Sequence, residues 1–201
     1  MTTLHIVVGL VALQRLAELL WSNHNVRSLK AKGAIEAGAG HYPLFFLVHG
    51  SWLLAILLLT PASTPVEPWA LLLYCILQVG RVWVLMSLGG YWTTRIITLP
   101  GRPLIRKGPY RFLRHPNYLI VACEIALLPL AFHDVGIAVT WSLANGVLLM
   151  WRIRVEDATL SARYESANEA SGSVARQRLL NASPRRPLHR IRDRSGTRRW
   201  S

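Results

Sequence analysis

The chain has 201 residues, of which 52% are hydrophobic and 16% charged, and its formal net charge is +13. This length suits one domain, and the apolar content is too high for a typical soluble one, so the composition favours a membrane protein. Nine arginines lie between Arg176 and Arg199, followed by a single aromatic residue, Trp200. Because nucleic-acid-binding modules interleave aromatic with basic residues, we expect no nucleic-acid partner, and a basic segment that lies against anionic lipid headgroups.

The sequence contains five apolar runs, at 4–21, 42–60, 69–88, 118–132 and 135–151. A helix needs about 20 apolar residues to cross the hydrocarbon core, and the last two runs, slightly short, are predicted to form a helical hairpin that turns at His133 and Asp134. The segment 89–117 is rich in Arg, Gly and Pro and must lie at the surface, because a bilayer would leave its backbone unsatisfied. We therefore predict an all-α polytopic membrane bundle with about five transmembrane helices.

Basic residues follow the first, third and fifth runs, whereas the opposite connections contain no Lys or Arg. By the positive-inside rule the N-terminus is then outside and the C-terminus cytoplasmic. The Arg-rich, Lys-poor usage suggests a GC-rich bacterial genome, and we expect the protein in the bacterial inner membrane. We expect one transmembrane domain over 1–165 and a basic, disordered cytoplasmic tail over 166–201, whose composition cannot bury enough apolar surface to fold alone.

The N-terminus lacks a basic region followed by a small-residue cleavage site, so the first helix is expected to stay in the protein. Cys75 and Cys123 lie in apolar runs without CxxC or Cys–His spacing, which indicates neither a disulfide framework nor a metal site.

Four charged residues lie inside apolar runs, where charges are costly and therefore informative: Arg15, Glu18, Arg81 and Glu124. Arg15 and Glu18 are three residues apart and share a helical face, which allows a local ion pair. Arg81 and Glu124 form either a second structural pair or a polar lining. Glu124 shares a face with Asn117, so we treat it as a candidate substrate contact as well as a structural residue.

The segment Gly108 to Tyr118, with the sequence GPYRFLRHPNY, leads from the basic surface segment into the fourth apolar run. Pro116 suits the first turn of a helix, whose free N–H groups and positive dipole end attract anions. Arg111, Arg114 and His115 beside it make a candidate carboxylate or phosphate site, and the alternative is a loop of interfacial anchors.

Past the fifth run, Arg152 and Glu156 are four residues apart and lie on one helical face. A hairpin of the last two helices would return that face to the level of His115, so the two clusters should meet. The alternative is an ordinary charge pair at a helix end.

Gly-Pro-Tyr, then Arg-His-Pro-x-Tyr, a hairpin, and Arg-x-x-x-Glu resemble the isoprenylcysteine carboxyl methyltransferase family of membrane methyltransferases over about residues 92–164. The earlier part resembles a smaller bacterial branch, which includes enzymes that O-methylate alkylpyrones. The residues that carry this second resemblance are Arg15, Glu18, Asn25, Arg27, Gly33, Glu36, Gly40, His41, Tyr42, Pro43 and His49.

The resemblance implies a cytoplasmic cofactor-binding segment that holds S-adenosylmethionine. The cofactor residues it implies are Arg95, Leu104, Ile105, Tyr110, His115, Pro116, Asn117, Tyr118 and Glu156. It assigns Arg152 to the substrate, and Arg152 and Glu156 become the candidate catalytic residues. Asp157 stands where a second Glu is common.

The resulting hypothesis is transfer of a methyl group to an acidic oxygen, a carboxylate or an enolate, of a lipophilic small molecule at the membrane. Such an oxygen arrives charged, so Arg152 would only orient it and no strong general base would be required. The alternatives are a phospholipid or small-lipid N-methyltransferase, whose amine substrate would favour an acidic pocket, and a non-catalytic membrane lipid-binding protein, which would not bind the cofactor.

Overall fold

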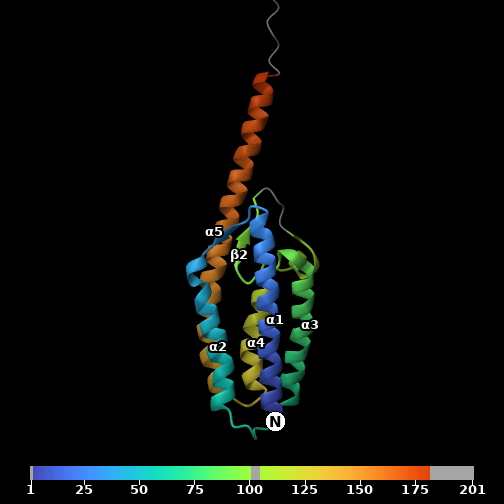
Figure 1. Ribbon diagram of the computed structural model, residues 1–201, viewed down its shortest axis with the longest axis vertical. Coiled ribbons are helices and arrows are strands. Elements are labelled where there is room, and N and C mark those ends of the chain that lie inside the picture. Colours follow the sequence, from blue (N-terminus) through green and yellow to red (C-terminus); the bar gives the residue numbers. More distant parts are fainter. Residues whose placement is uncertain (1, 101–104, 182–201) are drawn as a thin grey trace, which may run out of the picture. The chain divides into compact units, whose positions relative to one another are not determined.

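The computed structural model describes residues 2–100 and 105–181, with side chains up to residue 161 except at residue 41. Its helices, drawn in Figure 1, are α1 (Thr3–Ala31), α2 (Tyr42–Leu59), α3 (Pro68–Leu88), α4 (Pro116–Leu130) and α5 (Val135–Asn181). In the described part of the chain, α1, α2, α3 and the first part of α5 are long and apolar enough to cross a membrane, and α4 is a shorter apolar helix. The predicted all-α membrane bundle is therefore confirmed.

The chain divides into two compact units, residues 1–163 and 164–201, and the site described below lies in the first. In the second unit, α5 continues to Asn181. The first part of the predicted tail, up to Asn181, is thus helical, and it contains no proline. Residues 182–201 of the predicted tail lie outside the described residues.

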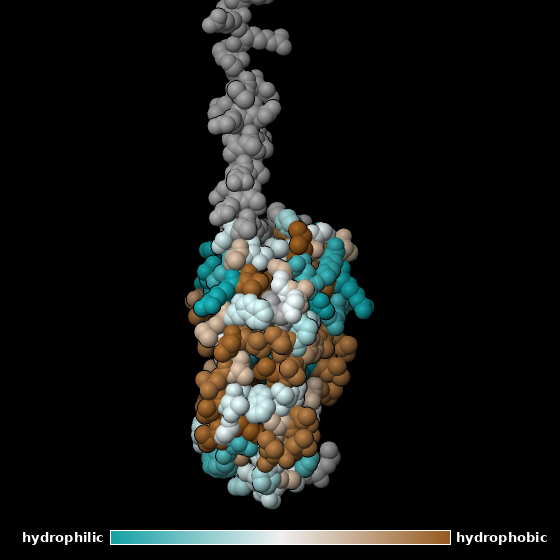
Figure 2. Space-filling model, turned by 90° about the vertical axis from the view of Figure 1, so that its left-hand side faces the viewer, coloured by the Kyte–Doolittle hydropathy of each residue, from teal (hydrophilic) through white to brown (hydrophobic). Residues whose placement is uncertain are grey.

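The outer surface of the first unit carries large apolar side chains on its long helices. They include Leu10, Leu13 and Leu20 on α1, Leu58 on α2, Val79 and Met86 on α3, and Leu143 and Val147 on α5. Figure 2 shows a broad hydrophobic belt on the face of the molecule that it presents, with hydrophilic residues above and below it. A belt of this kind fits contact with lipid tails rather than with water.

Inside the bundle, α3 packs against α4. Gly80 on α3 faces Ile120 on α4, and a Cβ at the glycine would make an ordinary van der Waals contact of 3.6 Å with Ile120 Cδ1. Trp52 on α2 and Ile125 and Leu128 on α4 are completely buried in the same core. Because lipid tails are as apolar as leucine, such close packing, rather than transfer out of water, holds membrane helices together.

The predicted hairpin between α4 and α5 is confirmed. Pro129 lies in the last turn of α4, and His133 adopts a left-handed backbone with φ of 58°. The Asp134 carboxylate then accepts hydrogen bonds from the Ile137 amide at 3.2 Å and from the Thr60 hydroxyl at 2.9 Å. The side chain thus caps the start of α5 and ties it to the end of α2.

At the opposite end of the bundle, two short strands connect the segment after α1 to the segment after α3. Strand β1 (Ile35–Ala37) pairs antiparallel with β2 (Ile96–Thr98), with Glu36 opposite Ile97. Burial by itself would raise the pKa of Glu36, but hydrogen bonds from Lys30 and Arg95 outweigh it and lower the pKa below its ordinary value. The strand pair and these ion pairs fix the backbone just before it reaches the site.

Candidate functional site

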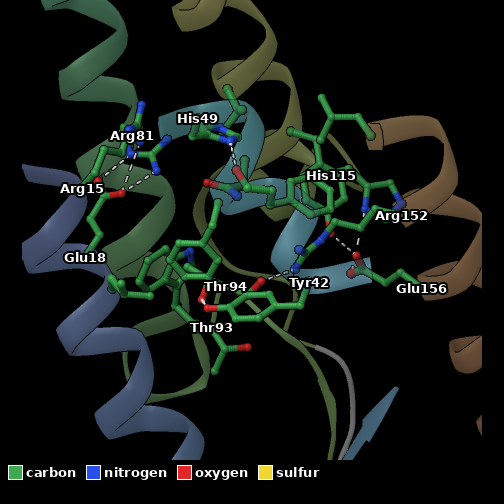
Figure 3. Close-up of a pocket in the computed structure, with 18 of the residues that line it drawn as sticks. Arg15, Glu18, Tyr42, His49, Arg81, Thr93, Thr94, His115, Arg152 and Glu156 are labelled. Atoms are coloured by element: carbon green, nitrogen blue, oxygen red, sulfur yellow. Dashed lines mark hydrogen bonds and ion pairs between the residues drawn. The ribbon is translucent and has the colours of Figure 1, made fainter. Parts of the chain in front are cut away.

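A cavity of about 390 Å³ lies inside the first unit, between α1, α2, α3, α4, α5 and the segment 92–94. Its volume falls in the range usual for small-molecule sites, about 300–1,000 Å³. Figure 3 shows charged side chains in two groups, with aromatic and other apolar residues lining the rest. One group contains the motif residues, and the other contains the intramembrane charges of α1 and α3.

The motif group is organised around the hydroxyl of Tyr118, in the first turn of α4. This hydroxyl donates to the Glu156 carboxylate and accepts from Arg152 Nε at 2.8 Å. A second Arg152 nitrogen, Nη2, donates to the Thr94 carbonyl at 2.6 Å. Arg152 is 7% exposed, so its position is set by two neighbours rather than by solvent.

His115 brings the two predicted clusters together, as the sequence predicted. Its Nδ1 lies 3.9 Å from a Glu156 carboxylate oxygen, and its ring stacks on Tyr118 with centroids 5.2 Å apart. His115 Nε2 is 3.4 Å from Asp157 without a hydrogen-bond geometry. The helix start and the end of the membrane part of α5 therefore form one polar wall.

Aromatic side chains complete this wall. The Arg152 guanidinium lies 5.0 Å from the Phe45 ring centre and 5.5 Å from that of Tyr118, both within cation–π distance. The Thr94 carbonyl accepts the hydrogen bond from Arg152. The Thr94 hydroxyl forms hydrogen bonds with the hydroxyls of Ser22 at 2.8 Å and Tyr42 at 2.9 Å, which fix the position of this residue. The position of Arg152 thus depends on α1, α2 and α4 together.

The second group is a buried ion network. Arg81 donates to both oxygens of Glu18, at 2.5 and 2.6 Å, and to Glu124 at 2.9 Å. Arg15 donates to Glu124 at 2.7 Å and to Glu18 at 3.2 Å. Gln78 donates to the remaining Glu124 oxygen at 2.7 Å. Two arginines and two glutamates balance one another, which is how membrane interiors accommodate charge.

Both predicted pairs in this group are thus present, but the assignment of Glu124 to the substrate needs correction. Glu124 is completely buried and does not line the cavity, because Arg15, Arg81 and Gln78 occupy its carboxylate. Arg15, Glu18 and Arg81 line the cavity instead.

The other predicted site residues fall into those that line the cavity and those that do not. Six line the cavity: Tyr110, His115, Asn117, Tyr118, Arg152 and Glu156. Pro116 begins α4 beneath them, as expected. Arg95 differs from the prediction: it lies over the Tyr42 ring at 4.4 Å and bonds Glu36, outside the cavity lining. Ile105 does not line the cavity, and Leu104 lies outside the described residues.

Sequence reasoning missed several lining residues, above all Phe45 and Thr94. Thr94 acts through a backbone carbonyl, which no side-chain pattern signals. Phe45 is one more apolar residue in an apolar run, and only the packing of α2 against the site distinguishes it from its neighbours.

Tyr110 belongs to the short 3-10 helix η3 (Gly108–Arg111), and burial, with the nearby Glu156 carboxylate, raises the pKa of its hydroxyl. Gly108 begins this turn with φ of +52°, a conformation that side chains disfavour. A Cβ there would overlap Ser87 and lie 3.1 Å from Trp83 Nε1.

Replacing Gly108 with alanine should therefore destabilise the protein by about 1–3 kcal/mol, through backbone strain and this contact. Thermal unfolding in detergent would measure the change. Gly146→Ala is the matched control, because a Cβ at that position in α5 meets no atom within 4 Å and alanine favours helix. Equal unfolding temperatures for the two variants would show that the turn does not depend on glycine.

Comparisons with known proteins support the family resemblance. Residues 70–162 match the Isoprenylcysteine carboxyl methyltransferase (ICMT) family. The chain is 38% identical over 159 residues to the uncharacterized protein YpbQ of Bacillus subtilis strain 168. The aligned region covers 77% of this chain and 95% of that relative. An uncharacterized protein of Haemophilus influenzae strain Rd is 27% identical over 126 residues, 60% of this chain and 72% of the relative. No solved structure matches. With its bundle of membrane-spanning helices, the chain belongs to the isoprenylcysteine carboxyl methyltransferase family of membrane methyltransferases.

Proposed function

We propose that the protein is an S-adenosylmethionine-dependent O-methyltransferase of the bacterial inner membrane, with its site on the cytoplasmic side, and that it acts on a lipophilic acceptor with an acidic oxygen. One observation carries this proposal: His115, Tyr118, Arg152 and Glu156 converge at a single cavity whose remaining surface is largely apolar. This combination suits a polar cofactor and a lipophilic acceptor that share one cavity.

The motif group fits the cofactor's chemistry. Asn117 Oδ1 and His115 Nε2 are buried and have no hydrogen-bond partner in the part of the chain that the structure describes. Buried polar atoms of this kind normally have a partner, and a bound ligand can provide it. Glu156 supplies a carboxylate for a cationic group, and the positive dipole end of α4 favours an anionic one.

S-adenosylmethionine would be held by Tyr110, His115, Asn117, Tyr118 and Glu156, and when bound it supplies an electrophilic methyl group on a sulfonium. The protein's own contribution is then alignment and exclusion of water. Arg152 is suited to orient the acceptor oxygen, since Thr94 and Tyr118 hold Nη2 and Nε, and Nη1 has no hydrogen-bond partner among the described residues. The rings of Phe45 and Tyr118 contact the guanidinium and shield it from water.

The test is transfer of labelled methyl from S-adenosylmethionine by the purified protein to a lipid extract of the source bacterium. His115→Ala should weaken cofactor binding at least about tenfold, because a hydrogen bond to a charged group contributes about 1.5–3 kcal/mol. His24→Ala, an exposed position on α1, should leave binding unchanged.

The chemistry of the labelled product separates the alternatives. Label released by mild base indicates a carboxyl ester, and stable label on oxygen indicates an ether. Label on an amine would replace the proposal with an N-methyltransferase. Absence of both cofactor binding and transfer in the wild-type protein would favour a non-catalytic lipid-binding role.

A further inference from the structure

The connection between β2 and α4 carries an exposed surface that the mechanism above does not use. We call it the Phe112 surface, and its residues are Phe112, Leu113, Arg106, Lys107, Arg111 and Arg114. We propose that it binds an anionic phospholipid of the surrounding membrane. The basic side chains hold the phosphate group, and the two apolar side chains lie among the acyl chains. This inference is independent of the proposed methyl transfer.

The Phe112 surface lies beside the last turns of α3. Gly108, four residues before Phe112, is so close to α3 that a Cβ there would overlap Ser87 and lie 3.1 Å from Trp83 Nε1. Figure 1 shows this connection beside the upper end of α3. Trp83 is itself exposed on a helix long and apolar enough to cross a membrane, and tryptophan is enriched where such helices meet the headgroups. The contact therefore predicts that the Phe112 surface lies at headgroup level.

Two large apolar side chains are exposed in this surface. Phe112 is 78% exposed and Leu113 is 47% exposed. Their amides both donate to the Pro109 carbonyl, at 3.1 and 3.0 Å, so backbone hydrogen bonds hold the turn that carries them. Apolar side chains next to basic ones are typical of segments that lie in a membrane interface, where the apolar area leaves water and enters the acyl boundary.

The basic side chains of the Phe112 surface have few carboxylates to pair with. The sequence contains no Asp or Glu between residues 68 and 123. Arg114, which also lines the cavity, lies 3.7 Å from the Asp157 carboxylate, too far for a hydrogen bond. The other three basic residues form no ion pair with any residue that the structure describes. The surface thus has an excess of positive charge that a phosphate group can balance.

This combination of charge and apolar area selects an anionic phospholipid. Arginine bonds two phosphate oxygens at once, and lysine adds a compact positive charge. In a zwitterionic lipid, the amine group would be repelled by the same basic side chains, whereas an anionic lipid carries no balancing positive charge. A free phosphate ion would leave Phe112 and Leu113 in contact with water.

Photo-crosslinking tests the surface locally. The full-length protein in phosphatidylcholine nanodiscs would receive a small fraction of phosphatidylglycerol with a diazirine near the glycerol end of one acyl chain. After irradiation, mass spectrometry should find label on residues 106–114. Phosphatidylcholine with the same diazirine should label them at least about tenfold less, as expected when two or more basic side chains each change binding about fivefold.

The readout is confined to this segment, so lipid held by the arginines between Arg176 and Arg199 does not contribute. Equal labelling of residues 106–114 by the two probes would show no preference for an anionic lipid and would overturn the proposal. Loss of the label on addition of millimolar inorganic phosphate would also overturn it, because the surface would then be a site for the free ion.

Paired variants test the charges without touching a cavity residue. Lys107→Gln combined with Arg111→Gln should lower the label at least about tenfold. Lys107→Arg combined with Arg111→Lys keeps both charges and should retain most of it. The matched control is Arg27→Gln with Lys32→Gln, which removes the same charges at exposed positions at the end of α1 and should leave the label unchanged. Equal losses in this control and in the first pair would attribute the effect to net charge and overturn the proposal.

A third pair tests the apolar contact. Phe112→Ser combined with Leu113→Ser should lower the label at least about fivefold, because apolar area that lay among acyl chains is removed. The unfolding temperature in detergent should match that of the wild type, since both side chains are exposed. An unchanged label would place both side chains outside the lipid and contradict the proposed mode of binding.

Discussion

Replacing Arg152 with lysine is expected to slow methyl transfer by about 10²- to 10³-fold while leaving cofactor binding nearly unchanged. Arg152 uses two nitrogens to bond the Thr94 carbonyl and the Tyr118 hydroxyl and has a third for the acceptor. A lysine ammonium is a single point of charge and cannot hold that planar arrangement. Single-turnover transfer and equilibrium cofactor binding, measured on the same preparation, would separate the two effects.

The matched control is Arg154→Lys, the same change two residues along the same helix. Arg154 is exposed and does not line the cavity, so this variant should retain the wild-type rate. Full turnover in Arg152→Lys would remove Arg152 from the orienting role. A parallel loss in both variants would point to a general effect on α5.

The second large effect is expected in the ion network. Glu124→Leu removes a carboxylate that accepts from Arg15, Arg81 and Gln78 and leaves one positive charge uncompensated in a buried site. Breaking a buried pair in this way costs about 3–5 kcal/mol, a large fraction of the stability of most domains. The folded yield and the unfolding temperature in detergent should both fall.

A double variant tests the cause. Arg15→Leu combined with Glu124→Leu restores the charge balance and leaves Arg81 bonded to both oxygens of Glu18. It should therefore be more stable than Glu124→Leu alone, as shown by a double-mutant cycle. If the double variant were less stable by the sum of both losses, packing rather than charge balance would explain the effect.

Much of the fold could be predicted because membrane helices must be long, apolar and internally hydrogen-bonded. The apolar run 69–88 predicted α3 (Pro68–Leu88) to within one residue, and the break between two short apolar runs predicted the turn at His133. The convergence of His115 with Glu156 followed from the hairpin alone. The ion pairs of Arg15 and Arg81 could also be expected, since unpaired charges are costly in a bilayer.

Other features depend on which helices are neighbours, which periodicity does not specify. Glu124 shares a helical face with Asn117, yet it turns to Arg81 because α3 packs against α4. Arg95 pairs with Glu36 because β1 and β2 bring together segments far apart in the chain. Thr94 enters the site through its backbone, and no residue type identifies that role.

The short helix α4 determines how deep the site lies. The Glu67 amide, just before α3, bonds the Ala131 carbonyl, just after α4, at 2.8 Å, so the two helices are level at that end. α4 has 15 residues and α3 has 21, and six residues correspond to about 9 Å of helix. His115, which directly precedes α4, therefore lies below the level of the far end of α3 by about that distance. For the lipophilic acceptor proposed above, the mole fraction in the bilayer, and not the aqueous concentration, would then govern saturation of the site.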